Sequence, residues 1–337
     1  MFNIENRRYV GNKAKLMPWI RAEIIKNCKN CNSFCDIFAG TGVVTGFLID
    51  LYNMYFINDF LYSNEIIYKG FFKNEKYNKV KLKEIELKYQ SINSKKINNN
   101  YISENFGDKF FSNEDAKVIG YIREDIEKSY KKKAINEKEY CVLLASLIYS
   151  LDKIANTVGH YEAYRKKTKI FEKFNYELIV PMRVEGKKIK ISRCDANDIA
   201  KKIKCDIVFI DPPYNSRQYS RFYHLLETLV KWDKPKLYGI AMKPKEENMS
   251  DYCRASAPEV FANLIEDLDC KYIVVTYNNT YNSKSSSSKN KISLKEIDII
   301  LSKKGNTLVL NKPYKFFNAG KSNLQGHKEY LFITKVR

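Results

Sequence analysis

The chain has 337 residues, of which 44% are hydrophobic and 14% aromatic. This length and composition exclude global disorder and suit either one large domain with an insertion or two domains. Lys and Arg number 59 against 39 Asp and Glu, which gives a formal net charge of +20. This charge favours a polyanionic partner such as nucleic acid. The alternative is that the lysines reflect an AT-biased genome, since the chain is also rich in Asn, Ile and Tyr.

Strands and helices alternate at the start of the chain. A helix is expected over 14–27, a strand over 33–38, a helix over 42–51 and a second strand over 55–58. This order is a β-loop-α-β unit, which opens a nucleotide-binding α/β fold. Residues 61–182 are rich in Lys, Asn and Glu with helical spacing and few strand signals, so they predict a helical insertion.

Alternation resumes after this insertion. Strands are expected over 188–193, 206–210, 271–276, 307–310 and 329–334, a helix over 293–303, and a Ser- and Lys-rich loop over 281–291. The sequence therefore predicts an α/β fold with a mixed seven-stranded, Rossmann-like sheet between helix layers. We assign 1–60 and 183–337 to this domain and 61–182 to the insertion.

A glycine-rich turn follows the first expected strand, in Asp36-Ile-Phe-Ala-Gly-Thr-Gly42. Gly40 and Gly42 allow the backbone to turn tightly and to approach a ligand closely. Asp36 can accept hydrogen bonds from an ammonium group, and Asp59 ends the next strand, where a carboxylate suits ribose hydroxyls. Because the glycine spacing departs from G-x-G-x-x-G, NAD is not the expected ligand.

A second turn, Asp211-Pro-Pro-Tyr214, follows the apolar strand 207–210. Active sites of α/β proteins form at this end of a strand. The prolines stiffen the turn and fix the direction of the Pro212 carbonyl. That carbonyl and the Asp211 carboxylate can accept hydrogen bonds from an exocyclic amine, while Tyr214 offers a flat face on which a flipped base can stack. An ordinary proline-rich turn is the alternative.

In this order the motifs resemble the DNA amino-methyltransferases of the N6-adenine group, in which the cofactor motif precedes the catalytic motif. The resemblance covers about 1–60 and 185–337 and implies a class I methyltransferase fold with S-adenosyl-L-methionine as cofactor. It implies a cofactor role for Asp36, Phe38, Gly40, Gly42 and Asp59, and a catalytic role for Asp211, Pro212, Pro213 and Tyr214.

The resemblance also extends to shorter motifs. Arg8-Tyr-Val-Gly-Asn-Lys13 matches the N-terminal motif, which implies that Tyr9 and Lys13 help to hold the methionine end of the cofactor. Asp195, followed by Ala196, matches a carboxylate placed near the cofactor adenine amine, and Tyr277-Asn-Asn279 falls where a further motif belongs. By position, the insertion corresponds to the target-recognition region of the family.

Two segments are candidate DNA contacts. After the catalytic turn, Arg217 and Arg221 could meet phosphates, and Gln218 and Tyr219 could fill the vacated base stack; the alternative is a helix that packs Phe222 and Leu225. The basic and aromatic segment 156–167 suits backbone and base contacts, and a solvated loop is its alternative. Its candidate residues are His160, Tyr161, Tyr164, Arg165 and Lys166. We expect His224 to be structural.

The expected function is site-specific transfer of a methyl group from S-adenosyl-L-methionine to N6 of adenine in double-stranded DNA by base flipping. The expected context is a restriction-modification system, with a cognate restriction endonuclease as candidate partner. Direct transfer requires neither a metal nor a covalent enzyme intermediate, and the eight cysteines are interpreted as reduced thiols. We expect a cytoplasmic monomer or weak dimer without a membrane span. The alternatives are an N4-cytosine, RNA or protein amine methyltransferase, and a non-catalytic DNA-binding specificity subunit.

Overall fold

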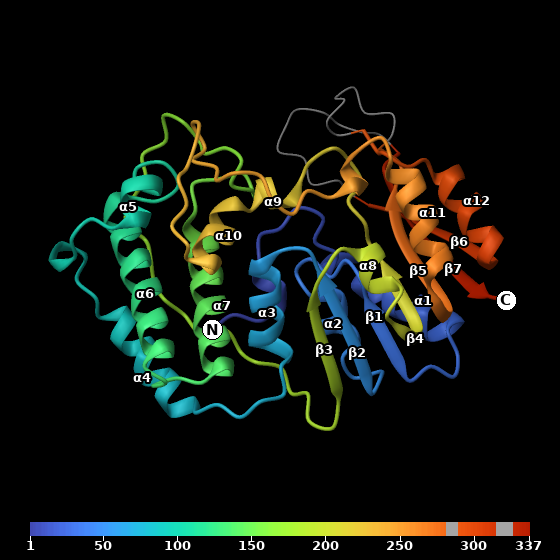
Figure 1. Ribbon diagram of the computed structural model, residues 1–337, viewed down its shortest axis with the longest axis horizontal. Helices are drawn as coiled ribbons and strands as arrows, with labels where there is room; N and C mark the ends of the chain where they lie inside the picture. The colour runs from blue at the N-terminus through green and yellow to red at the C-terminus, as the bar shows by residue number, and fades with distance from the viewer. Residues whose placement is uncertain (281–288, 315–325) are drawn as a thin grey trace. The chain divides into compact units, whose positions relative to one another are not determined.

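The computed structural model describes residues 1–280, 289–314 and 326–337 (Figure 1). Most of the loop expected over 281–291 therefore lies outside the described residues. The chain divides into two compact units, each considered by itself. We call them the sheet unit (Lys13–Phe60, Gly186–Tyr219 and Asn248–Arg337) and the helical unit (Met1–Asn12, Leu61–Glu185 and Ser220–Glu247).

The sheet unit contains a seven-stranded sheet in the order β3-β2-β1-β4-β5-β7-β6. The strands are β1 (Ser33–Asp36), β2 (Met54–Asp59), β3 (Lys188–Arg193), β4 (Lys204–Ile210), β5 (Asp269–Asn278), β6 (Gly305–Pro313) and β7 (Lys328–Val336). Strands β1 to β5 pair in parallel, whereas β7 pairs antiparallel with both β5 and β6. The mixed seven-stranded sheet is thus confirmed, and each expected strand is present within a few residues of its expected bounds.

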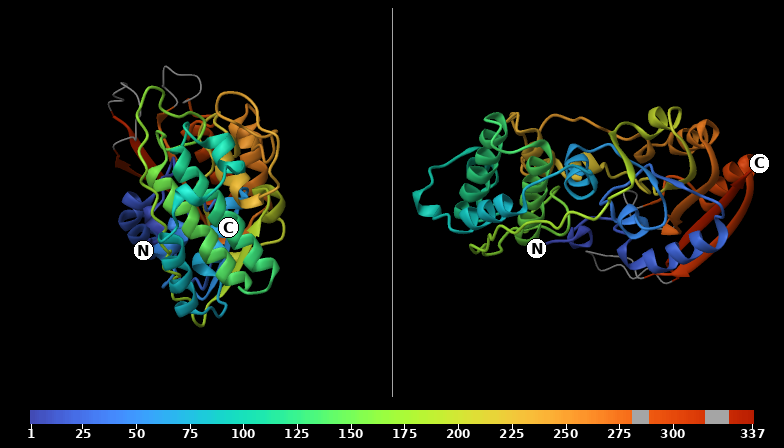
Figure 2. Two further views of the ribbon diagram at one scale, coloured as in Figure 1. Left: turned by 90° about the vertical axis from the view of Figure 1, so that its left-hand side faces the viewer. Right: turned by 90° about the horizontal axis from the view of Figure 1, so that it is seen from below.

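Helices cover both faces of the sheet. The two views place α1 (Met17–Asn27) on one face and α11 (Ala257–Asp267) and α12 (Leu294–Lys304) on the other (Figures 1 and 2). The remaining α-helices of this unit are α2 (Val43–Leu48) and α8 (Ala196–Ala200). A hydrophobic core lies between the sheet and helices α8, α11 and α12. Its buried side chains come from both strands and helices and include Cys35, Val208, Ile273, Phe332, Phe261, Ile297 and Leu301. This two-sided burial explains the uninterrupted apolar run at the end of β4.

The helical unit is built around α7 (Glu137–Ile154), most of whose side chains are buried. Its other α-helices are α3 (Tyr62–Phe72), α4 (Lys79–Gln90), α5 (Tyr101–Phe106), α6 (Asn113–Lys131) and α10 (His224–Lys231). Helix α6 shows why the segment is helical, because its buried Ala116, Ile119, Ile122 and Ile126 recur every three or four residues. Ser112 caps this helix by accepting a hydrogen bond from the Asp115 amide.

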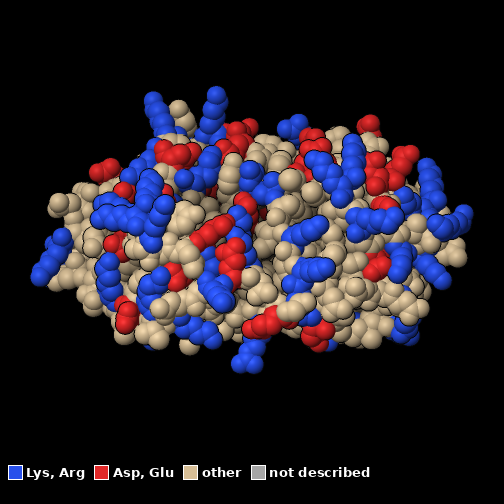
Figure 3. Space-filling model, turned by 60° about the horizontal axis from the view of Figure 1, so that its bottom comes forward, with Lys and Arg blue, Asp and Glu red and all other residues tan. Residues whose placement is uncertain are grey.

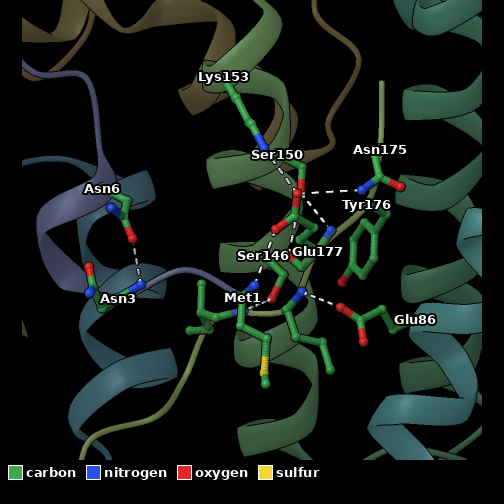
Figure 4. A network of polar contacts seen from close by, with 12 residues as sticks. Met1, Asn3, Asn6, Glu86, Ser146, Ser150, Lys153, Asn175, Tyr176 and Glu177 are labelled. Atoms are coloured by element: carbon green, nitrogen blue, oxygen red, sulfur yellow. Dashed lines mark hydrogen bonds and ion pairs between the residues drawn. The ribbon is translucent and has the colours of Figure 1, made fainter. Parts of the chain in front are cut away.

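Residues 177–179, which belong to no helix or named strand, are held in this unit by polar contacts (Figure 4). The Glu177 carboxylate lies 3.0 Å from Lys153 Nζ and 3.2 Å from the Met1 amino group. The next two amides donate to side chains of the helices, Leu178 to Glu86 Oε1 and Ile179 to Ser146 Oγ, each at 2.9 Å. Side chains of α4 and α7 thereby replace the backbone partners that a strand would supply.

The helical unit differs in extent from the expected insertion. It contains the whole of 61–182, and it also contains Met1–Asn12 and Ser220–Glu247, two segments that the sequence-based division places in the catalytic domain. The latter segment carries α10, which follows the short α9 (Tyr219–Phe222) and buries Leu225. The alternative interpretation of the segment after the catalytic turn, a helix that packs Phe222 and Leu225, therefore describes its backbone. No described helix is long and apolar enough to cross a membrane.

Candidate active site

The candidate site begins where parallel strands end. Strand β1 ends at Asp36, β2 ends at Asp59, and Asp211 follows the last residue of β4. Because β1 pairs in parallel with both β2 and β4, the three carboxylates lie along one edge of the sheet. This carboxyl edge is where ligands bind in open α/β sheets.

The glycine turn adopts backbone conformations that side chains disfavour. Gly40 has φ +52° and Gly42 has φ +77°, both in the left-handed region. Gly42 is also the residue from which α2 starts. The Gly40 amide donates a hydrogen bond of 2.9 Å to Asp59 Oδ2, so the turn and the end of β2 hold each other in place.

Asp36 is fully buried beside this turn. Its Oδ2 accepts a 2.9 Å hydrogen bond from Thr45 Oγ1, whereas its Oδ1 has no hydrogen-bond partner among the described residues. Burial raises the pKa of Asp36 to about 7; the charge of Asp211 adds to this, and the Thr45 hydrogen bond opposes it. A buried acceptor without a partner is a site for a cationic donor, which fits the expected ammonium of S-adenosyl-L-methionine.

The loop after β3 is joined to the same edge. Asn58 is buried, and its amide group donates to the carbonyls of Ile37 and Cys194, at 3.1 Å each. Asp195 caps α8 by accepting a hydrogen bond from the backbone N–H of Asn197, and burial raises the pKa of Asp195. The neighbouring Ala196 is buried, and Phe38 packs edge-on against Tyr252 at 4.9 Å between ring centroids. The structure thus brings Phe38 and Asp195 to the edge that carries Asp36.

The Asp211 side chain receives three donors on one oxygen. Oδ1 lies 2.7 Å from the Tyr214 hydroxyl, 2.9 Å from Thr276 Oγ1 and 3.0 Å from Lys13 Nζ. Among the described residues, no hydrogen bond or ion pair falls on Asp211 Oδ2, and none falls on the Pro212 carbonyl. The turn therefore presents two acceptors, and their role in binding an amine stays a prediction.

Glu329, near the start of β7, is a site residue that the sequence did not reveal. Its Oε1 lies 2.8 Å from the Tyr214 hydroxyl and 3.3 Å from Lys13 Nζ. Lys13 and Tyr214 thus each contact both Asp211 and Glu329. Glu329 is 3% exposed, and burial raises its pKa. A charged residue inside an apolar strand was the available signal, but a lone carboxylate does not identify its partners.

The Tyr214 ring is positioned by β5. The Tyr277 hydroxyl donates to the Tyr214 carbonyl at 3.1 Å, and the two ring centroids lie 4.3 Å apart. The Lys291 amide donates to the same carbonyl at 2.8 Å, and Lys13 Nζ lies 4.9 Å from the Tyr214 ring centroid. The structure thereby joins Tyr277, from the motif expected at 277–279, to the catalytic turn. Pro212 is buried and Pro213 is half-buried beside it.

The N-terminal motif is divided between the two units. Lys13 belongs to the sheet unit, where Asp211 and Glu329 raise its pKa against the opposing effect of burial. Tyr9 belongs to the helical unit. There it stacks on Tyr223 with ring centroids 4.5 Å apart.

The candidate DNA residues after the catalytic turn have mixed environments. Gln218 uses both ends of its amide on the Ser250 backbone, at 2.8 and 2.9 Å, so this side chain holds a loop in this structure. In the helical unit, Arg221 donates to the Pro244 carbonyl at 2.8 Å. Arg217 and Tyr219 are half-buried in the sheet unit.

The basic segment of the helical unit separates into exposed and buried members. Arg165 and Lys166 are exposed, whereas His160 stacks on Phe222 and Tyr164 packs edge-on against Phe110. Tyr161 is 2% exposed, and its hydroxyl donates a hydrogen bond to Asp152. The sequence-based expectation that Tyr161 contacts DNA therefore does not fit its buried position. His224 is buried, and its Nε2 lies 2.8 Å from the Tyr161 carbonyl oxygen, as expected for a structural residue.

Comparison with known proteins agrees with this geometry. A family model described as D12 class N6 adenine-specific DNA methyltransferase matches residues 9–311. The chain is 30% identical to the type II methyltransferase M.NlaIII of Neisseria lactamica, over 97% of this chain and 98% of that protein. It is 28% identical to M.CviAII of Paramecium bursaria Chlorella virus 1, over 97% and 98% of the two chains.

A longer relative matches as well. The type II methyltransferase M.FokI of Planomicrobium okeanokoites is 30% identical over 97% of this chain, which spans about half (52%) of that protein. The family match begins within the N-terminal motif and extends past the catalytic turn into β6. It includes the strand ends that carry Asp36, Asp59 and Asp211, whereas Glu329 in β7 lies outside it. The chain belongs to the D12 class of N6 adenine-specific DNA methyltransferases.

Proposed function

We propose that this chain transfers a methyl group from S-adenosyl-L-methionine to N6 of an adenine in double-stranded DNA, and that Asp211 and the Pro212 carbonyl hold the amine. One observation carries the assignment of these residues. Asp211 Oδ1 lies within 3.0 Å of three donor groups, those of Tyr214, Thr276 and Lys13. Asp211 Oδ2 and the Pro212 carbonyl oxygen lack a partner among the described residues. Donors on one oxygen fix the carboxylate and leave the other oxygen to the substrate.

The proposed chemistry follows from two acceptors on one amine. In a free adenine the N6 lone pair is delocalised into the ring. Hydrogen bonds from the amine to Asp211 Oδ2 and to the Pro212 carbonyl favour a pyramidal nitrogen, whose lone pair is then free to attack. When bound, the cofactor supplies an electrophilic methyl group on its sulfonium. As the bond between N6 and the methyl group forms, the bond from the methyl group to sulfur breaks and leaves a neutral thioether. The positive charge that develops on N6 is stabilised by the nearby carboxylate, and it is removed when N6 loses a proton.

The cofactor-binding residues are assigned from the buried polar atoms of the sheet edge. Asp36 Oδ1 is buried without a described partner and suits the cofactor ammonium. Asp59, oriented by the Gly40 amide, suits the ribose hydroxyls, as carboxylates at the end of a second strand do in dinucleotide folds. Asp195 is proposed to accept from the adenine amine. Lys13 contacts Asp211 in this structure, so we propose that it supports the catalytic turn in addition to the cofactor.

Duplex DNA is the proposed substrate form. Lys and Arg side chains are spread over the face shown in Figure 3, with Asp and Glu among them. We propose Arg165 and Lys166 as phosphate contacts, since both are exposed and basic side chains dominate affinity for DNA. An adenine inside a duplex is inaccessible, so base flipping is required, and the Tyr214 ring offers a surface for the flipped base.

The relatives M.NlaIII, M.CviAII and M.FokI are named as type II methyltransferases. We propose by analogy that this chain modifies a specific DNA sequence within a restriction-modification system, with a cognate endonuclease as partner, and that it acts in the cytoplasm. Sequencing of modified bases in DNA from cells that express the chain tests this directly. The expected result is N6-methyladenine at one short sequence; N4-methylcytosine, or modification of RNA alone, would contradict it.

The residue assignment is tested with Asp211→Ala and a matched control, Asp298→Ala, which removes an exposed carboxylate from α12. We expect the first variant to lose methylation of a DNA duplex while retaining most of its DNA affinity by fluorescence anisotropy, and the second to resemble wild type in both. Calorimetric binding of the cofactor by the wild-type chain separates the enzyme from a non-catalytic specificity subunit. Full methylation by Asp211→Ala would overturn the proposed mechanism.

A further inference from the structure

We propose that Glu329 is a positioning residue of the reaction: it shares the ammonium of Lys13 with Asp211 and so preserves the negative charge that Asp211 offers to the substrate amine. The inference rests on the proposed function of Asp211. It concerns a residue that is distant in sequence from every recognised motif, 115 positions after Tyr214.

Four side chains are joined by hydrogen bonds and ion pairs, and Thr276 Oγ1 also donates to Asp211 Oδ1. Lys13 Nζ lies 3.0 Å from Asp211 Oδ1 and 3.3 Å from Glu329 Oε1. The Tyr214 hydroxyl lies 2.7 Å from the same Asp211 oxygen and 2.8 Å from the same Glu329 oxygen. Two groups that can donate therefore each bridge the two carboxylates. All four residues belong to the sheet unit.

Burial makes the charge balance of this set important. The side chains of Lys13, Glu329 and Asp211 are 6%, 4% and 18% exposed, so water screens their interactions weakly. Without Glu329, the ammonium and Asp211 would form a pair with no net charge. With Glu329, two carboxylates share one ammonium, and the set retains a net negative charge beside the amine that becomes cationic during attack.

The hydroxyl of Tyr214 adds a second argument. It carries a single hydrogen and can donate to only one carboxylate at a time, whereas Lys13 carries three hydrogens and can donate to both. Glu329 therefore competes with Asp211 for the tyrosine proton and for the ammonium. Both effects keep Asp211 a strong acceptor, and both also fix the orientation of the Tyr214 ring. Glu329 does not itself reach the amine in this scheme, because it acts through Lys13 and Tyr214.

A double-mutant cycle tests the proposal. Glu329→Gln removes the charge and keeps the shape; it is made in the wild-type chain and in a Lys13→Gln background. Glu266→Gln, an exposed change on α11, is the control. Single-turnover methylation of duplex DNA is measured at saturating cofactor and DNA, together with KM for each and the midpoint of thermal unfolding.

In the wild-type background we expect Glu329→Gln to lower the single-turnover rate about tenfold, with KM values changed by less than about threefold. In the Lys13→Gln background the same substitution should cost about threefold or less, because no ammonium remains to be shared. Equal losses in both backgrounds, or a rate within about twofold of wild type for the single variant, would overturn the proposal.

The controls separate other causes. If wild type and Glu266→Gln produce no N6-methyladenine, the proposed function itself fails, rather than the role of Glu329. If Glu329→Gln does not fold, the cycle is repeated with Glu329→Asp, which keeps the charge and withdraws it from Lys13; a rate loss that depends on Lys13 again supports the proposal. Failure of both variants to fold would assign Glu329 a purely structural role and overturn it.

Discussion

Asp36→Asn should stabilise the unliganded protein at alkaline pH and weaken its cofactor binding. The carboxylate is fully buried, and Oδ1 has no partner among the described residues. An asparagine in the same position keeps an oxygen for the hydrogen bond from Thr45 Oγ1 and removes a buried charge. Active sites commonly trade stability for such groups.

The pKa shift sets the size and the sign of the effect. Burial raises the pKa of Asp36 from 3.8 to about 7. Between these two pH values the folded protein holds a proton that the unfolded chain has released, so the free energy of unfolding falls as the pH rises through this window. Ionisation in the folded state then costs roughly 4 kcal/mol by pH 8, because each pKa unit corresponds to about 1.4 kcal/mol.

Urea unfolding without cofactor at pH 8 and pH 5 measures this directly. At pH 8 we expect the free energy of unfolding of Asp36→Asn to exceed that of wild type by up to roughly 4 kcal/mol. At pH 5 the difference should be clearly smaller, because Asp36 is then largely protonated in the folded protein. Calorimetry should show cofactor affinity lowered by about tenfold or more, since a charged hydrogen bond is lost. Asp298→Asn, on the exposed face of α12, should change neither quantity. An Asp36→Asn variant less stable than wild type at pH 8, or one with wild-type cofactor affinity, would refute the reasoning.

Three further outcomes are expected. A Cβ on Gly305 would lie 2.0 Å from the Lys335 carbonyl oxygen, so Gly305→Ala should lower the free energy of unfolding by roughly 1–3 kcal/mol in urea; an unchanged midpoint would contradict this packing. Burial lowers the pKa of His224 to about 3, so its ring should stay neutral with unshifted NMR resonances from pH 5 to pH 9, and a titration midpoint inside that range would count against it. Tyr214→Phe keeps the stacking ring and removes the hydroxyl, so turnover should fall about tenfold at nearly constant KM for DNA; an unchanged turnover would show that the hydroxyl is dispensable.

The site residues that the sequence predicts are those whose positions depend only on a neighbouring strand. Asp36, Asp59 and Asp211 each follow an apolar run, and such a run predicts both a buried strand and the point at which it ends. The parallel order of β2, β1 and β4 then brings the carboxylates to one edge. A motif confined to a strand and the turn after it can therefore be placed without knowledge of the rest of the fold.

The part that was missed depends on pairing between distant strands. Thr276 meets Asp211 across 65 positions and Glu329 meets Tyr214 across 115. Both lie in strands that could be expected, but their partners follow from the register of β5 with β4 and β7. A one-residue shift in register would turn each side chain to the opposite face of the sheet, and composition does not fix that register.

Composition also failed to separate contact residues from core residues. The segment 156–167 mixes basic and aromatic side chains, yet Tyr161 is buried and Arg165 is exposed. The difference arises because the Tyr161 hydroxyl finds a buried partner in Asp152, a residue of α7. A tyrosine serves equally well as a core side chain with a satisfied hydroxyl and as a surface for bases, so its type alone does not decide.

The charge of the candidate site runs opposite to that of the chain. The whole chain carries a formal +20, which favours approach to DNA phosphates. The sheet edge instead gathers the carboxylates of Asp36, Asp59, Asp211 and Glu329, of which Asp211 and Glu329 contact Lys13. Both species that the proposed reaction must stabilise there are cationic, the sulfonium cofactor with its ammonium and the methylated amine before it loses a proton. A neutral or positive edge would attract the polyanion at least as well, but it would stabilise neither of these cations. We therefore expect substitutions that remove carboxylates from this edge to act on cofactor binding and on the chemical step, and substitutions of Arg165 or Lys166 to act on DNA affinity.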